Sequence, residues 1–126
     1  MTIRKICLLV MFLLLVPAYL WAGDISVWSG GVGEEERLAA PAGNVKIELF
    51  QQGGKYVADA ELVIRDLDHQ KAVVVREQMK GPWCIVNLPN GNYSAIAIRA
   101  NGDRQGARFV VKPGKHLKFS LKFPAQ

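Results

Sequence analysis

Apolar and polar side chains alternate with a period of two over most of the chain after residue 44. The alternation is clearest in segment 116–123, where it places Leu117, Phe119, Leu121 and Phe123 on one face of an extended strand. We expect this face to be buried. Such alternation is typical of half-buried β-strands. The pattern predicts strands at 45–50, 60–65, 71–78, 83–88, 92–99, 107–112 and 116–123.

Residues that favour turns separate the predicted strands. Gly53-Gly54, Gly81-Pro82, Pro89-Asn90-Gly91 and Pro113-Gly114 are the clearest cases. Seven short strands at nearly regular spacing with such turns are typical of a sandwich of two sheets. The sequence therefore predicts an all-β fold, a seven-stranded antiparallel β-sandwich with Greek-key connections.

The first segment, residues 1–22, has the pattern of a secretory signal peptide. Arg4 and Lys5 precede an apolar stretch that ends in the small residue Ala22. An uncleaved membrane anchor is the competing interpretation, but Pro17 interrupts the run and leaves about 16 residues, short for a membrane-spanning helix. We expect cleavage after Ala22 and a periplasmic protein, with an extracellular location left open.

Residues 23–43 form a lead-in that is rich in Gly and Glu. Three acids at 34–36 precede Arg37, and Pro41 ends the segment. Acids near the start and a base near the end suit the helix dipole, so one or two helical turns are predicted here. The folded domain is expected over residues 44–126.

Composition and charge narrow the class of protein. The chain has 126 residues, half of them apolar, which suits one globular domain and excludes a disordered chain. Cleavage of the leader would leave 14 basic and 11 acidic residues. The balance is uneven, since seven basic residues from Arg99 onward stand against Asp103 alone. Such asymmetry can mark a surface that meets anions, although a solvated β-face has the same composition.

No catalytic or metal-binding constellation is recognisable in the sequence. No serine lies in a Gly-x-Ser-x-Gly setting, and Cys84, the single cysteine after the leader, lies in an apolar strand. The glycines at 30–33 precede three glutamates that would repel phosphate. Asp66, Asp68 and His69 share a polar turn, and such residues usually serve the turn itself. We expect no enzyme, no cofactor and no metal.

The segment 81–93 carries the most recognisable motif, Leu88-Pro89-x-Gly91-x-Tyr93 between two strands. Over residues 44–123 the chain resembles the carboxypeptidase regulatory-like domains, which are seven-stranded, prealbumin-like (transthyretin-like) sandwiches. The stretch 30–36 resembles the lead-in of small exported proteobacterial proteins, most of which lack an assigned function. The resemblance implies a non-catalytic module, because in the peptidases of that name the zinc ligands belong to a separate domain.

The motif has a structural explanation. Pro89 fixes its own φ angle and stops the strand, and Gly91 tolerates a positive φ. Tyr93 can then pack inward with its hydroxyl group bonded to the backbone of the turn. We expect Leu88, Pro89, Gly91 and Tyr93 to lock a corner of the fold and not to bind a ligand.

The first functional hypothesis is a protein-interaction or scaffolding module of the cell envelope. If Tyr93, Ala95 and Ala97 face the core, then Ile96 and Ile98 lie on the opposite face. Either the lead-in covers these isoleucines or they form a patch for a protein partner or for self-association. We expect the lead-in to cover them.

The second hypothesis is a binding module for anionic or carbohydrate polymers, such as lipopolysaccharide or peptidoglycan. Alternation places Lys118 and Lys122 on one face of the last strand. Nucleic acid is not expected, given the export signal, and membrane contact is expected only through the leader before cleavage. The candidate residues are Arg108, Lys112, Lys118 and Lys122, with Trp28 and Tyr56 as stacking surfaces.

Overall fold

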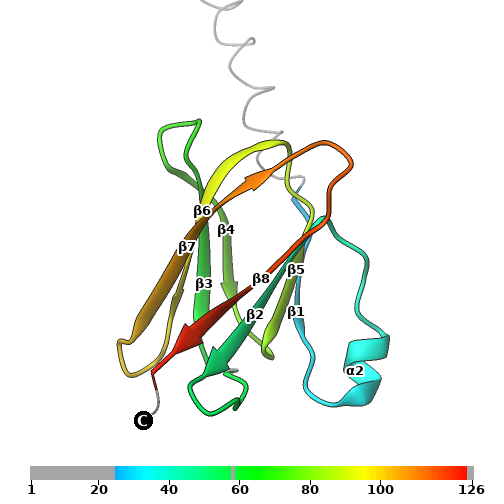
Figure 1. Cartoon of the computed structure of the whole chain (residues 1–126), viewed down its shortest axis with the longest axis vertical. Coiled ribbons are helices and arrows are strands. Elements are labelled where there is room, and N and C mark those ends of the chain that lie inside the picture. The colour runs from blue at the N-terminus through cyan, green and yellow to red at the C-terminus, as the bar shows by residue number, and fades with distance from the viewer. Residues whose placement is uncertain (1–24, 58, 125–126) are drawn as a thin grey trace, which may run out of the picture.

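The computed structural model describes residues 25–57 and 59–124, and the predicted signal peptide lies outside them. Two four-stranded sheets face each other, with one short helix, α2, beside β1 (Figure 1). Sheet A has the strand order β1-β5-β2-β8, and sheet B has the order β4-β3-β6-β7. The bounds are β1 Val27–Gly30, α2 Glu34–Leu38, β2 Val45–Gln51, β3 Glu61–Asp66, β4 Ala72–Gln78, β5 Trp83–Val86, β6 Gly91–Ile98, β7 Arg104–Val111 and β8 Leu117–Phe123.

The predicted all-β sandwich is confirmed, but the described residues form eight strands and not seven. The extra strand is β1, which comes from the lead-in and pairs with β5, Trp28 lying opposite Ile85. Its four residues are too short for a visible alternation, and tertiary pairing alone makes them a strand. The helical turn predicted in the lead-in is α2.

The prediction of a purely antiparallel sandwich is wrong at one pair of strands. Strands β2 and β8 run parallel over their whole length, from Val45 opposite Leu117 to Gln51 opposite Phe123. The amide of Leu117 donates a 2.8 Å hydrogen bond to the carbonyl of Asn44, so both strands begin at the same end of the sandwich. The other strand pairs are antiparallel.

The core lies between the two sheets and contains the residues that alternation assigned to it in β6. Tyr93, Ala95 and Ala97 point inward and are buried. In β8, Leu121 and Phe123 are buried as predicted, whereas Leu117 and Phe119 are only partly buried. The expectation of a fully buried face is therefore wrong at the start of this strand, because β8 forms an edge of its sheet.

The described part of the lead-in, residues 25–43, does not cover Ile96 and Ile98, contrary to our expectation. Its strand β1 belongs to sheet A, and these isoleucines lie on the outer face of sheet B. In the described part of the chain, no helix has the length and apolarity needed to cross a membrane.

Candidate functional site

The predicted basic residues lie along one edge of the sandwich, where β7 of sheet B meets β8 of sheet A. They divide between three surfaces of that edge. Arg108 projects from the outer face of sheet B, Lys118 and Lys122 project from the outer face of sheet A, and Lys112 follows the end of β7. We define the basic edge as the cations of β7, β8 and their connection: Arg104, Arg108, Lys112, Lys115, Lys118 and Lys122.

Lys118 is held by an acid that the sequence did not reveal. The carboxylate of Glu48 on β2 lies 3.2 Å from the ammonium group of Lys46 and 3.3 Å from that of Lys118. Glu48 is 8% exposed, so the two cations compensate a carboxylate that is largely removed from water. Only the parallel register, which places Lys46 opposite Lys118, brings these groups together.

Aromatic side chains occupy the middle of the same outer face. The ammonium group of Lys46 lies 3.3 Å from the ring centroid of Trp83. The guanidinium carbon of Arg37 lies 4.8 Å from the ring centroid of Tyr56 and 5.3 Å from that of Trp83. The Nε of Arg37 also donates a 3.0 Å hydrogen bond to the carbonyl of Gly31. Arg37 therefore fastens the lead-in to sheet A through two cation–π contacts, which the sequence analysis did not anticipate.

The two predicted stacking residues stand apart from the basic edge. Trp28 is half-buried on β1, and β5 and β2 separate it from Lys118 on β8. Tyr56 is 49% exposed, but Arg37 covers one side of its ring and Phe50 lies 5.2 Å away between ring centroids. These rings lie on the same sheet face as Lys118. They do not form one continuous surface with all four predicted cations, because Arg108 belongs to the other sheet.

Ile96 and Ile98 are half-buried on the outer face of sheet B, and Ile98 is the last residue of β6. Ile96 lies between Val63, which is only 6% exposed, and Gly106, while Ile98 lies between Glu61 and Arg104. Arginines surround these isoleucines, and among the described residues Glu61 forms the one ion pair with them, its carboxylate lying 2.7 Å from Arg76. We define the arginine face by Arg65, Arg76, Arg104 and Arg108 around Ile96.

The Leu-Pro-x-Gly-x-Tyr motif locks the turn between β5 and β6, as its residue types predicted. Tyr93 is buried, and its hydroxyl group donates a 2.7 Å hydrogen bond to the carbonyl of Pro89. Gly91 has a φ of 156°, and a Cβ atom there would lie 3.0 Å from Oδ2 of Asp68. Leu88 is buried in the core.

The polar turn at Asp66–His69 is used by the fold itself. Asp68 accepts a 2.8 Å hydrogen bond from the amide of Asn92, and this bond is the main reason that its pKa lies below the ordinary value. Nδ1 of His69 lies 2.7 Å from Oδ2 of Asp66. Within residues 25–57 and 59–124, no three His, Cys, Asp or Glu side chains are grouped so that they could hold a metal ion.

The thiol of Cys84 lies inside the core. Burial, assisted by the negative charge of Glu77, raises the pKa of this thiol to about 12. At neutral pH the group is therefore protonated, whereas the nucleophilic form of cysteine is the thiolate.

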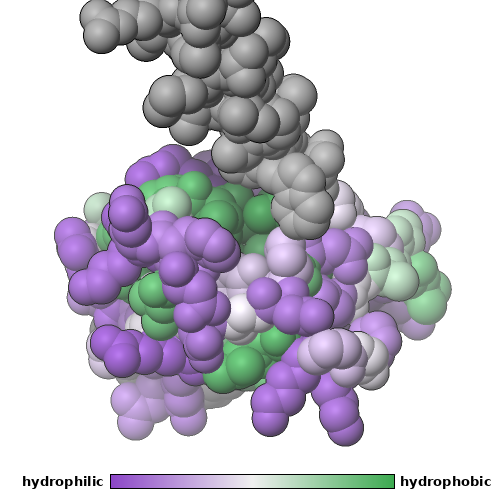
Figure 2. All heavy atoms as spheres, turned by 90° about the horizontal axis from the view of Figure 1, so that it is seen from above, coloured by the Kyte–Doolittle hydropathy of each residue, from purple (hydrophilic) through white to green (hydrophobic). Residues whose placement is uncertain are grey.

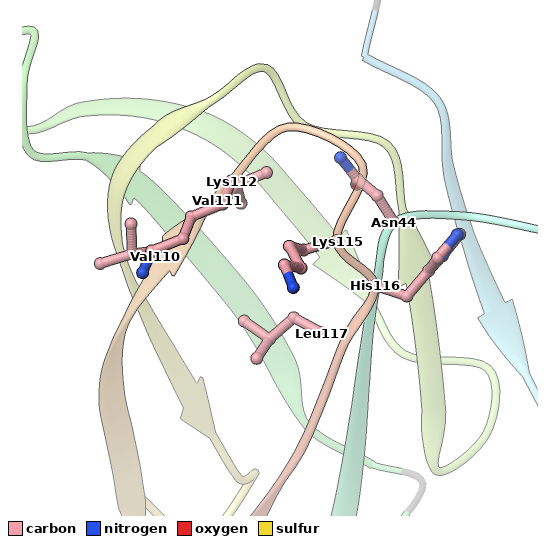
Figure 3. Close-up of a pocket in the computed structure, with 7 residues that line it drawn as sticks. All are labelled: Asn44, Val110, Val111, Lys112, Lys115, His116 and Leu117. Carbon is pink, nitrogen blue, oxygen red and sulfur yellow. The ribbon is translucent and has the colours of Figure 1, made fainter.

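A pocket of about 340 Å³ opens where β7 turns into β8 (Figure 3). Figure 2 views the molecule from this end and shows apolar surface bordered by polar side chains. The lining residues are Asn44, Val110, Val111, Lys112, Lys115, His116 and Leu117.

The chain matches no known protein family, and no curated protein matches its sequence.

Proposed function

We propose that the protein is exported through a signal peptide at residues 1–22, and that residues 44–126 form a carboxypeptidase regulatory-like domain with prealbumin-like, Greek-key topology. The basic start of this segment and the apolar stretch that follows it support export. The corner formed by Tyr93 and Pro89 supports the family assignment, because the motif that carries the resemblance also makes this contact. A periplasmic location follows from the proposed leader.

We infer that this domain is a non-catalytic binding module for anionic polymers of the cell envelope. One observation carries the proposal. Among the described residues, five of the six cations of the basic edge form no ion pair with an acid, and Lys118 alone is paired, with Glu48. Unpaired cations spaced along two neighbouring strands suit an extended polyanion, which gains from many weak charge contacts at once.

The arrangement of reactive groups supports a binding role over a catalytic one. The thiol of Cys84 is buried and protonated, and Asp66, Asp68 and His69 are engaged in a turn. The basic edge offers positive charge, and its one contact with a carboxylate, between Lys118 and Glu48, is an ion pair.

Retention on an immobilised polyanion tests this function. The purified protein is applied to dextran sulfate, and uncharged dextran of the same length serves as the control polymer. We expect retention on dextran sulfate that falls steeply as salt rises, and no retention on dextran. Equal behaviour on the two polymers would remove charge as the basis of binding.

A second candidate function is protein interaction or envelope scaffolding through the arginine face. Its support is the half-buried pair Ile96 and Ile98 on a face that carries four arginines and Glu61, which suits an acidic protein partner or a second copy of the chain. Sedimentation velocity of the purified protein and cross-linking in intact cells test it. An Ile98→Lys variant should lose the association and keep its fold, whereas a monomer without cross-linked products would contradict this candidate.

A further inference from the structure

The pocket between β7 and β8 combines an apolar wall with a cationic rim. Val110 is 49% exposed and Leu117 is half-buried, although both belong to strands whose neighbouring positions are in the core. Both residues line the pocket, and Figure 3 shows Val110 near the end of β7 and Leu117 at the start of β8. An apolar group that entered here would cover surface that water now contacts.

The rim carries two lysines, Lys112 and Lys115, at the two ends of one tight turn. The amide of Lys115 donates a 3.2 Å hydrogen bond to the carbonyl of Lys112, and Gly114 adopts a φ of 68° in that turn. In Figure 3, Lys115 points into the opening toward Leu117. Nδ1 of His116 lies 3.3 Å from the carbonyl of Gly43, at the β2 side of the pocket.

Charge at this place favours an anion. No acidic residue lines the pocket, and neither Lys112 nor Lys115 forms an ion pair in the part of the chain that the structure describes. A volume of about 340 Å³ is at the small end for ligand pockets, which suits one headgroup and a short length of alkyl chain.

We propose that this pocket binds an anionic amphiphile of the phosphorylated-lipid class. The phosphate lies between Lys112 and Lys115, and the alkyl chain lies against Val110 and Leu117. The inference rests on the proposed function, because Lys112 and Lys115 belong to the basic edge. It adds a ligand that is recognised by an apolar group as well as by its negative charge. A polyanion needs only the cations, whereas this ligand needs the cations and the apolar wall together.

Titration with octyl phosphate below its micelle concentration tests the proposal. Inorganic phosphate measures binding by charge alone, because it has no alkyl chain. Octyl glucoside measures binding by the alkyl chain alone, because it has no charge. We expect octyl phosphate to bind at least ten-fold more tightly than either, and to shift the amide resonances of residues 110–117. Equal affinity for octyl phosphate and for either control ligand would overturn the proposal.

Two variants with matched controls locate the site. Lys112→Gln/Lys115→Gln and Val110→Asn should each weaken octyl phosphate binding at least five-fold. The controls are Lys71→Gln/Lys80→Gln, which removes two exposed lysines elsewhere, and Val73→Asn, which changes a valine on β4 that is 40% exposed. Both controls should bind octyl phosphate as the unchanged protein does. If variants and controls respond alike, the ligand binds elsewhere and the proposal fails.

Dextran sulfate distinguishes this inference from the function on which it rests. Because the polymer has no alkyl chain, Val110→Asn should leave its binding unchanged. Binding of dextran sulfate without selective binding of octyl phosphate would reject the pocket alone. Binding of octyl phosphate without binding of dextran sulfate would reject the polymer function alone.

Discussion

The hydroxyl group of Tyr93 donates a 2.7 Å hydrogen bond to the carbonyl of Pro89, across the turn that joins β5 to β6. Tyr93→Phe removes this bond and keeps the buried ring. We expect the free energy of unfolding to fall by about 1 kcal/mol, the usual net value of one such bond. Urea denaturation measures the change. Tyr56→Phe, at an exposed ring, is the control and should change stability little, so an equal loss in both variants would contradict the role of the corner.

Stability should decrease as the solution becomes alkaline. The pKa of Cys84 is raised by burial from 9.0 to about 12, and that of Tyr93 from 10.0 to about 12. The unfolded chain therefore releases these protons at lower pH than the folded protein does. The stabilisation is complete below pH 9 and is lost between about pH 9 and 12, by up to about 1.4 kcal/mol per pH unit for Cys84 and by less for Tyr93.

Urea denaturation at several pH values between 8 and 11 measures this loss, and Cys84→Ala is the informative variant. It should flatten the dependence of the free energy of unfolding on pH between pH 9 and 10. In that range the thiol of Cys84 ionises in the unfolded chain, before the hydroxyl group of Tyr93 does. An unchanged slope in Cys84→Ala would show that this thiol is not protected by the fold.

Glu48 should matter for stability and for binding in opposite directions. Glu48→Gln keeps the shape of the side chain but leaves the ammonium groups of Lys46 and Lys118 without their anion. We expect a loss of about 1–2 kcal/mol of stability and tighter binding of dextran sulfate. The control is Glu61→Gln, whose pair with Arg76 is more exposed and should contribute less than about 0.5 kcal/mol. Similar losses in the two variants would contradict the burial argument.

The close approach of Gly81 to β1 gives a test of the eighth strand. A Cβ atom on Gly81 would overlap the backbone carbonyl of Gly30, whereas a Cβ atom on Gly33 would meet nothing within 4 Å. Gly81→Ala should therefore speed hydrogen exchange in β1 and in the paired part of β5. Gly33→Ala changes only the strained backbone of the lead-in and should leave β1 protected. Slow exchange in β1 of Gly81→Ala would mean that β1 does not depend on this contact.

Local sequence patterns predicted the features that depend on neighbouring residues. Alternation placed Tyr93, Ala95 and Ala97 in the core, and the Leu-Pro-x-Gly-x-Tyr motif predicted that the hydroxyl group of Tyr93 bonds to the backbone of the turn. These features follow from the two-residue period of a strand and from the geometry of one turn.

Features that depend on which strands pair could not be predicted from the sequence. Alternation puts Lys118 and Lys122 on one face, but it does not say that Glu48 lies beside Lys118 or that Arg108 belongs to the other sheet. Leu117 and Phe119 were expected to be buried because alternation does not distinguish an edge strand from a central one. Trp28 lies on β1, whose four residues form a strand only because they pair with β5.

The central claim is that cations of the basic edge hold a polyanion. The most direct measurement is the affinity for dextran sulfate at several salt concentrations, compared between Arg108→Gln/Lys122→Gln and the charge-matched control Lys71→Gln/Lys80→Gln. If each lost contact lowers the salt slope by about one, as for other polyanions, the first variant should lower it by about two. The control should retain the slope of the unchanged protein, and equal slopes in all three proteins would contradict the claim.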